Sequence, residues 1–193
     1  MKQNQAPRRT DEEIVALYWS RNEDAIRQTA DRYGQYCYAI AYNILSVRED
    51  SEECVNDTYL DAWNSMPPHK PTVLSAFLGK ITRRIAIDRW RQAHAQKRGG
   101  GEIALALDEL SECVASSGDV VREAETLEVA AAVQRFLDTL PDTERRVFVR
   151  RYWHMESVAV LAARFGYGQS RIKSMLHRTR GKLQKYLREE GLV

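Results

Sequence analysis

The stretch from Ser157 to Arg180, SVAVLAARFGYGQSRIKSMLHRTR, constrains the fold most, because its apolar residues have the spacing of two short helices packed across each other. Ala162 is small where the helices must come close, and Gly166 follows four residues later, where the turn can require a positive φ. The remaining apolar positions are spaced to close a core between the helices: Leu161, Phe165, Tyr167, Ile172 and Met175. This spacing predicts a helix–turn–helix.

The second helix of this pair leaves a polar and basic face outside the predicted core. The face consists of Gln169, Ser170, Arg171, Lys173, Ser174, His177 and Arg178. Side chains of these types can donate hydrogen bonds to phosphates and to base edges in a major groove. The pattern indicates DNA binding but does not say what the protein does on DNA.

Helical patterns also fill the rest of the chain, and no strand-like alternation of useful length occurs. Thr10 and Glu13 form a capping-box pattern that opens a helix through Tyr18. Further helices are predicted over residues 23–45, 51–64, 73–94, 123–138 and 142–153, and the prolines of SMPPHKPT separate the second from the third of these. The predicted fold class is all-α, with two small helical domains joined by a flexible linker.

Three consecutive glycines at positions 99–101 predict the boundary between the domains. Each lowers helix stability by about 1 kcal/mol relative to alanine, so we expect helical order to end there. We therefore assign residues 1–10 to a disordered N-terminus and 11–95 to the first domain. Residues 96–121 form a flexible acidic linker in this prediction, and 122–193 form the second domain with the helix–turn–helix.

The formal net charge of +2 hides an uneven distribution. Residues 11–64 carry 4 basic against 12 acidic side chains (−8), and residues 71–101 carry 7 against 1 (+6). Residues 102–128 carry 1 against 8 (−7), and residues 141–190 carry 12 against 5 (+7). Such runs are often only solvated faces, but two basic blocks on helical patterns indicate two contacts with a polyanion.

The sequence gives no sign of catalysis or of a bound cofactor. The four histidines are not at metal-ligand spacing with each other or with a cysteine, and neither a P-loop nor a GxSxG motif is present. Cys37, Cys54 and Cys113 are odd in number and widely spaced, which favours buried thiols over a disulfide framework. We expect no enzyme activity, no metal and no cofactor.

Neither a membrane span nor a secretory signal is apparent. No stretch approaches the ~20 apolar residues of a transmembrane helix. The N-terminal MKQNQAPRRT has no apolar segment behind its basic residues. We therefore expect a cytoplasmic protein without direct membrane insertion.

The predicted helix at 73–94 is the second candidate for function. Its apolar stripe leaves Lys80, Arg83, Arg84 and Arg91 on other faces, with Trp90 beside them. A basic solvated helix is the simpler interpretation, but cations interleaved with aromatic rings also hold single-stranded DNA. The preceding loop, residues 65–72, is stiffened by prolines and could form a rigid edge for an extruded base.

Several segments together resemble a known family. SEECVNDTYLDAW at 51–63 and FLGKITRRIAIDRWR at 77–91 resemble the core-binding and promoter-melting segments of bacterial RNA polymerase sigma factors, in particular the two-domain extracytoplasmic-function (ECF) group. LPDTERRVFVRRYW at 140–153, the helix–turn–helix and HRTRGKLQKYL resemble that family's C-terminal domain. The resemblance covers nearly everything except the predicted linker.

The resemblance implies a role for each candidate residue. Glu53, Asn56 and Asp57 would bind a coiled coil in the largest subunit of core RNA polymerase. The −10 promoter element, duplex and then melted, would be contacted by His69, Lys70, Lys80, Arg83, Arg84 and Arg91. The −35 element would be read by Gln169, Ser170, Arg171, Lys173 and Ser174, with Arg178 on phosphate. An anti-sigma factor is a further partner that the resemblance implies.

Two positions depart from the family pattern, and two alternative functions stay open. Many members carry Asn where this chain has Arg84, and Val160 replaces a common acidic residue near the turn. One alternative is a helix–turn–helix regulator that binds DNA without core polymerase. The other is a polymerase-binding interaction module in which the basic surfaces have no role.

Overall fold

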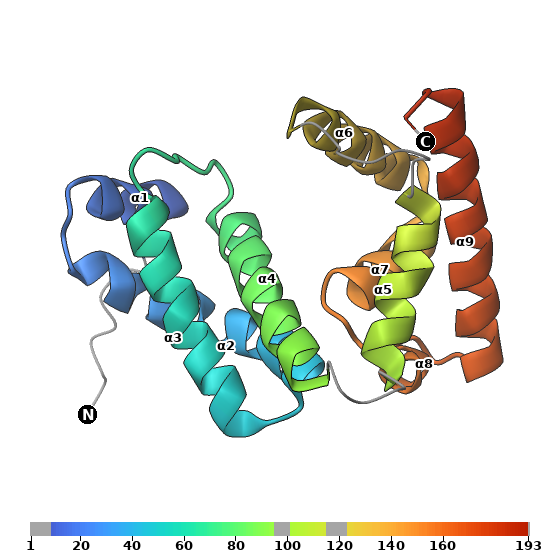
Figure 1. Cartoon of the computed structure of the whole chain (residues 1–193), viewed down its shortest axis with the longest axis horizontal. Helices are drawn as coiled ribbons and strands as arrows, with labels where there is room; N and C mark the ends of the chain where they lie inside the picture. Colours follow the sequence, from blue (N-terminus) through green and yellow to red (C-terminus); the bar gives the residue numbers. More distant parts are fainter. Residues whose placement is uncertain (1–8, 95–100, 115–122, 193) are drawn as a thin grey trace. The chain divides into compact units, whose positions relative to one another are not determined.

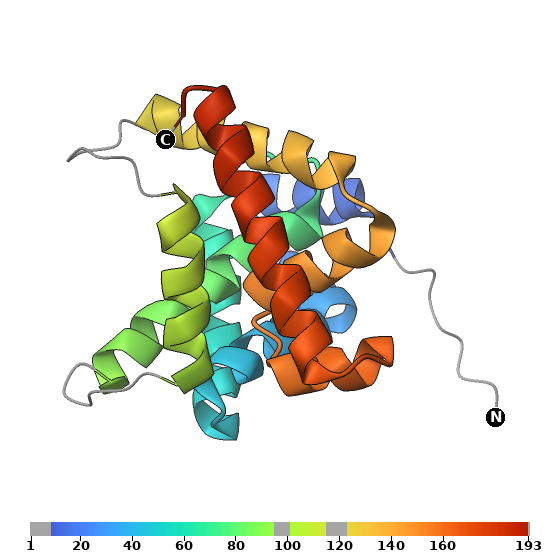
Figure 2. The ribbon, with the colours of Figure 1, turned by 90° about the vertical axis from the view of Figure 1, so that its right-hand side faces the viewer.

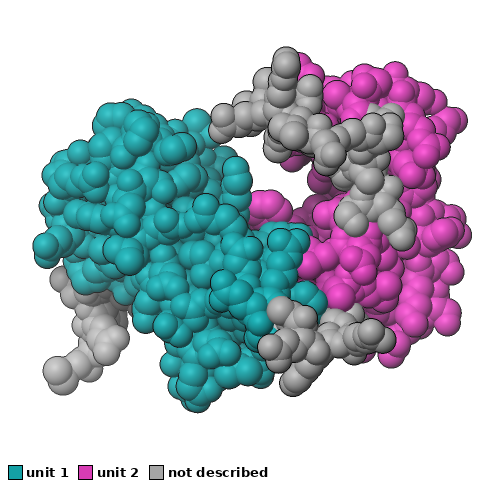
Figure 3. All heavy atoms as spheres, viewed as in Figure 1, with its two compact units in different colours: residues 1–96 teal, residues 97–193 magenta. Residues whose placement is uncertain are grey.

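The computed structural model describes residues 9–94, 101–114 and 123–192. These residues fall into two compact units, Met1–Gln96 and Lys97–Val193, which are described separately below (Figure 3). All secondary structure in the described ranges is helical, which confirms the all-α prediction (Figure 1).

The first unit consists of α1 (Asp11–Trp19), α2 (Asp24–Leu45), α3 (Arg48–Ser65) and α4 (Leu74–His94). Helices α2, α3 and α4 pack against one another, and α1 packs on α2. The buried side chains of all four helices form one core, which includes Ile14, Tyr18, Cys37, Tyr59 and Leu78. This core fixes the relative positions of the acidic α3 and the basic α4.

The predicted capping box opens α1. Thr10 Oγ1 accepts a hydrogen bond from the backbone N–H of Glu13 (3.3 Å), and Glu13 Oε2 accepts one from the N–H of Thr10 (2.7 Å). These contacts satisfy two of the donors that an N-terminus otherwise leaves unpaired.

Helix α3 begins at Arg48, three residues before the predicted start. The predicted range began at Ser51 because the apolar positions that define the helix begin at Val55. In the structure Ser51 is buried inside the helix, and its hydroxyl donates to the carbonyl of Val47 four residues back (2.5 Å). The first turn of α3 is polar, so apolar periodicity alone did not indicate it.

The second unit consists of α5 (Gly101–Val114), α6 (Glu123–Thr139), α7 (Asp142–Tyr152), α8 (Val158–Phe165) and α9 (Gln169–Glu189). Helix α9 contacts each of the other four helices of this unit, as the second view of the ribbon helps to follow (Figure 2).

Helix α5 corrects the prediction of a flexible linker over residues 96–121, which is wrong for residues 101–114. Gly101, the last of the three glycines, is the first residue of the helix, where a glycine costs the helix least. Ala106 is buried, and Ile103, Leu107 and Leu110 are half-buried at a spacing of one helical face. Residues 95–100 and 115–122 of the predicted linker, and residues 1–8 of the predicted disordered N-terminus, lie outside the described ranges.

A polar contact at Glu109 joins α5 to α7 and α9. Glu109 Oε2 accepts a hydrogen bond from the Tyr152 hydroxyl (2.9 Å) and forms an ion pair with Arg180 (3.1 Å). Arg180 also donates to the same hydroxyl (2.7 Å). The helix is therefore held to its unit by both apolar and charged contacts.

We expect Gly79→Ala to destabilise the first unit. A Cβ at Gly79 of α4 would collide with the phenol of Tyr36 on α2, so the ring would have to shift, and overpacking of this kind costs about 1–3 kcal/mol. Tyr36→Phe should recover part of the loss, because it removes the nearest atom. The measurement is urea unfolding followed by circular dichroism.

Gly181→Ala is the matched control. It lies within α9, and a Cβ there meets no neighbour, so alanine should raise stability by up to about 1 kcal/mol. An equal gain at both glycines would show that α2 and α4 do not approach as described.

Candidate nucleic-acid interface

Helices α8 and α9 are joined by a tight turn at residues 166–168. Ser157 caps α8, with its hydroxyl accepting a hydrogen bond from the backbone N–H of Val160 (3.2 Å). Gly166 ends α8 in the left-handed region at φ 67°, as the sequence pattern suggested. Leu161 and Ile172 are fully buried, whereas the predicted core residues Phe165 and Tyr167 are only half-buried.

All six predicted −35 residues lie exposed on α9. They are Gln169, Ser170, Arg171, Lys173, Ser174 and Arg178, and His177 is exposed beside them. The opposite face of α9 is buried and carries Ile172, Met175, Leu176 and Thr179. The structure therefore brings these candidates together on one solvent-exposed helix face.

Arg171 is positioned by an aromatic ring at the turn. Its guanidinium carbon lies 3.9 Å from the centroid of the Tyr167 ring, a cation–π arrangement. Because Tyr167 precedes α9, this contact fixes a cation near the end of α9 that carries Gln169 and Ser170. A positioned guanidinium suits both phosphate and guanine edges.

A buried carboxylate joins α7 to α8. Glu156, on the connection between them, accepts from Arg150 (2.6 Å) and Arg164 (3.1 Å), and its side chain is 7% exposed. Arg151, also buried, donates to the Glu156 backbone carbonyl (3.1 Å). This network was not predicted, because a lone Glu in a basic segment gives no sign of burial in the sequence.

The loop between α3 and α4 carries the predicted −10 residues His69 and Lys70, both exposed. Two residues of α1, one at each end of that helix, form hydrogen bonds to this loop and to the start of α4. The indole N–H of Trp19 donates to the His69 carbonyl (3.1 Å), and Asp11 Oδ2 accepts from the N–H of Leu74 where α4 begins (3.2 Å). Neither contact was predicted, since each joins residues at least 50 positions apart in the chain.

The four basic residues predicted on α4 do not share one environment. Lys80 and Arg91 are exposed. Arg83 is half-buried, and burial lowers the pKa of its guanidinium to about 10. Arg84 is exposed but forms an ion pair with Asp61 of α3. This pair gives the arginine that departs from the family pattern a partner within the chain.

Two of the three predicted polymerase-binding residues are held by a single arginine of α4. Arg89 donates to Glu53 (2.8 Å) and to Asp57 (2.5 Å), both on α3. Its hydrogen bond lowers the pKa of the Glu53 carboxyl, and hydrogen bonds to the two carboxylates raise the pKa of Arg89. We call Glu53, Asp57 and Arg89 the α3–α4 ion cluster.

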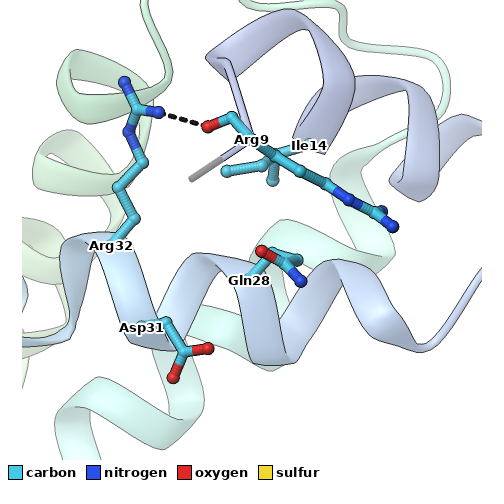
Figure 4. A pocket seen from close by; sticks show the side chains of 5 residues that line it. All are labelled: Arg9, Ile14, Gln28, Asp31 and Arg32. Carbon is cyan, nitrogen blue, oxygen red and sulfur yellow. Dashed lines mark hydrogen bonds between the residues drawn. The ribbon is translucent and has the colours of Figure 1, made fainter. Parts of the chain in front are cut away.

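Asn56, the third predicted polymerase-binding residue, faces a groove between α2 and α3. The groove has a volume of about 580 Å³ and is lined by Gly34, Gln35, Tyr38, Arg48, Glu52, Val55, Asn56 and Tyr59. A smaller pocket at the start of α1 is lined by Arg9, Ile14, Gln28, Asp31 and Arg32, and Arg32 donates to the Arg9 carbonyl across it (Figure 4). Its volume of about 30 Å³ holds a water or two, not a cofactor.

The described ranges offer neither a metal site nor a membrane-spanning helix. These residues hold no group of three His, Cys, Asp or Glu side chains suited to a metal ion. Among them, no helix combines the length and the apolar character needed to cross a membrane.

The sequence profile described as ECF sigma factor matches residues 48–189, from the start of α3 to the end of α9. The chain belongs to the ECF sigma factor family. The family supports an RNA polymerase sigma factor role for this chain, and its members are transcription initiation factors rather than enzymes.

Three curated relatives are similar to this sigma factor at low identity. It is 24% identical to the ECF RNA polymerase sigma factor SigE of Mycolicibacterium smegmatis over 165 residues, which cover 86% of this chain and 61% of SigE. It is 24% identical to SigW of Bacillus subtilis over 171 residues, covering 87% and 91% of the two chains. It is 26% identical to SigM of Mycobacterium tuberculosis over 180 residues, covering 93% and 85%.

A solved structure is similar as well. A complex of CnrH with the cytosolic domain of CnrY aligns with a TM-score of 0.43 at 23% identity, covering 93% of this chain and 97% of that one.

We expect the α3–α4 ion cluster to show a larger coupling energy than an ordinary surface pair. A double-mutant cycle with Arg89→Gln and Glu53→Gln, measured by urea unfolding at pH 7, tests this. The matched control is Arg48→Gln with Glu52→Gln, a pair on α3 in which both side chains are more than half exposed.

The coupling should depend on pH in a defined direction. The pKa of Glu53 is lowered in the folded chain. Its contribution to folding stability is therefore complete at pH values above its pKa in the unfolded chain, about 4.3. This stabilisation is lost as the pH falls through the lowered pKa of Glu53 in the folded chain. A cycle that gives the same coupling at pH 7 and at about pH 2 would contradict this assignment.

Proposed function

We propose that this sigma factor binds core RNA polymerase, recognises −35 and −10 promoter elements, and promotes strand opening. The observation that carries the proposal is the exposed polar and basic face of α9, next to a turn that fixes Arg171. A helix with this face can enter a major groove and read base edges. We assign the −35 element to Gln169, Ser170, Arg171, Lys173, Ser174 and Arg178.

The first unit supplies the other two surfaces of the proposal. We assign core-polymerase docking to Glu53, Asn56 and Asp57 on α3, with the groove beside Asn56 as its continuation. We assign −10 recognition and capture of the melted strand to His69, Lys70, Lys80, Arg83, Arg84 and Arg91. Arg84 would have to exchange Asp61 for a phosphate, which costs little because exposed ion pairs are weak.

Further partners and the location follow from the same assignment. A protein that starts transcription works where core polymerase and the chromosome are, so we place it in the cytoplasm. An anti-sigma factor that binds this chain is a separate element of the proposal, and co-purification from cells tests it without affecting the rest.

The decisive experiment is run-off transcription with purified core enzyme over a random promoter library. We expect a stable complex of this chain with core enzyme and transcripts that start downstream of a shared pair of sequence elements. Absence of any complex with core enzyme would contradict the sigma factor assignment. Binding of the chain alone to duplex DNA, with no dependence on polymerase, would favour the helix–turn–helix regulator instead.

Arg178→Ala should weaken promoter binding by the holoenzyme almost equally across sequences, because Arg178 is assigned to a phosphate. Loss of one phosphate contact lowers the slope of log affinity against log salt by about 1. Lys185→Ala is the matched control, because it removes an equal charge from the same helix, about two turns away and paired with Glu189. Equal slopes for the two variants would contradict the placement of Arg178 on DNA.

Gln169→Ala should act differently, since it removes a base contact. We expect a loss of about 1–3 kcal/mol on the preferred −35 sequence and a smaller loss on others. The measurement compares selected promoters that differ at single −35 positions.

A further inference from the structure

Trp19, the last residue of α1, is a large aromatic side chain that is 44% exposed. It lies before residues 48–189, the segment that the family profile matches. The exposed part of this ring is available to a binding partner, and an indole offers a large aromatic surface for such a contact.

The structure holds this ring in place beside the loop between α3 and α4. Its N–H donates to the His69 carbonyl, and its N–H is therefore already used within the chain. The next turn of chain is tied down as well, because Arg21 donates to the Trp63 carbonyl at the end of α3 (2.8 Å). A ligand that stacks on Trp19 therefore meets an ordered ring, which reduces the entropy lost on binding.

A cation lies at each of these two tryptophans. Lys70 Nζ lies 6.0 Å from the centroid of the Trp19 ring, and the guanidinium of Arg21 lies 5.4 Å from the Trp63 ring. An aromatic face beside an ammonium group matches an unpaired nucleotide, because the base stacks while the cation meets a flanking phosphate. An apolar protein partner would gain nothing from Lys70.

We propose that Trp19 is a stacking platform for one unpaired base of the opened promoter strand, with Lys70 on the adjacent phosphate. This inference rests on the proposed function, since it needs a melted strand at the loop. It adds α1 to the single-strand surface and gives Trp19 two roles: its N–H positions the loop through His69, and its ring face binds the base.

The experiment measures binding of short single-stranded DNA to the assembled holoenzyme, with core enzyme alone as background. Two labelled probes are compared: a 12-nucleotide oligothymidylate and a 12-nucleotide abasic strand with the same phosphates. Trp19→Leu should weaken binding of oligothymidylate about 5- to 150-fold, the range for loss of one stacked base, and leave the abasic probe unchanged.

Trp19→Phe separates the two roles of the side chain. Phenylalanine keeps an aromatic face but lacks the N–H that reaches His69, so this variant should retain most of the oligothymidylate affinity. Circular dichroism of each variant checks that the unit is folded.

In the free chain, quenching of tryptophan fluorescence by oligothymidylate should be smaller for Trp19→Phe than for the natural sequence. This comparison does not need the leucine variant to fold.

Three outcomes would overturn the inference. These are no loss with Trp19→Leu, an equal loss on both probes, or a loss with Trp19→Phe as large as that with Trp19→Leu. Each can occur in a holoenzyme that still initiates transcription, so failure here is distinguishable from failure of the sigma factor assignment, in which no holoenzyme forms.

Discussion

The close packing of α3 against α4 is the constraint on which the first unit depends. The two helices meet through small side chains: the Thr58 hydroxyl donates to that of Thr82 (3.1 Å), which in turn donates to the Leu78 carbonyl of its own helix (2.9 Å). Both hydroxyls are buried. Buried polar groups that are fully bonded fix a single register between two helices. That register is what brings the arginines of α4 to the carboxylates of α3.

Ion pairs between helices neutralise part of each basic block that the sequence contains. Arg84 and Arg89, two of the cations in the first basic block, meet carboxylates of the acidic block that precedes it. In the second unit Arg180 meets Glu109 of α5 in the same way. Part of each basic block therefore stabilises the fold, and the surface offered to a polyanion is smaller than the formal charges indicate.

Local patterns in the sequence were sufficient to predict most helices and the exposed face of α9. Helix periodicity and the Gly166 turn depend only on neighbouring residues. Helix α5 was missed, since three glycines outweighed the weaker stripe of Ile103, Leu107 and Leu110. The Trp19–His69 contact and the α3–α4 ion cluster were also missed. Both join residues far apart in the chain, and only the packed register of the helices decides whether such residues meet.

Helix α5 also limits the reach of the chain between the two units. Seven steps separate His94, the end of α4, from Gly101, the start of α5, and a fully extended chain spans at most about 3.6 Å per step, or about 25 Å. Had residues 95–122 been one extended connection, the same bound would be about 100 Å. As long as α5 stays docked on α7 and α9, the upper bound on this connection is thus about a quarter of the one that the predicted linker implies.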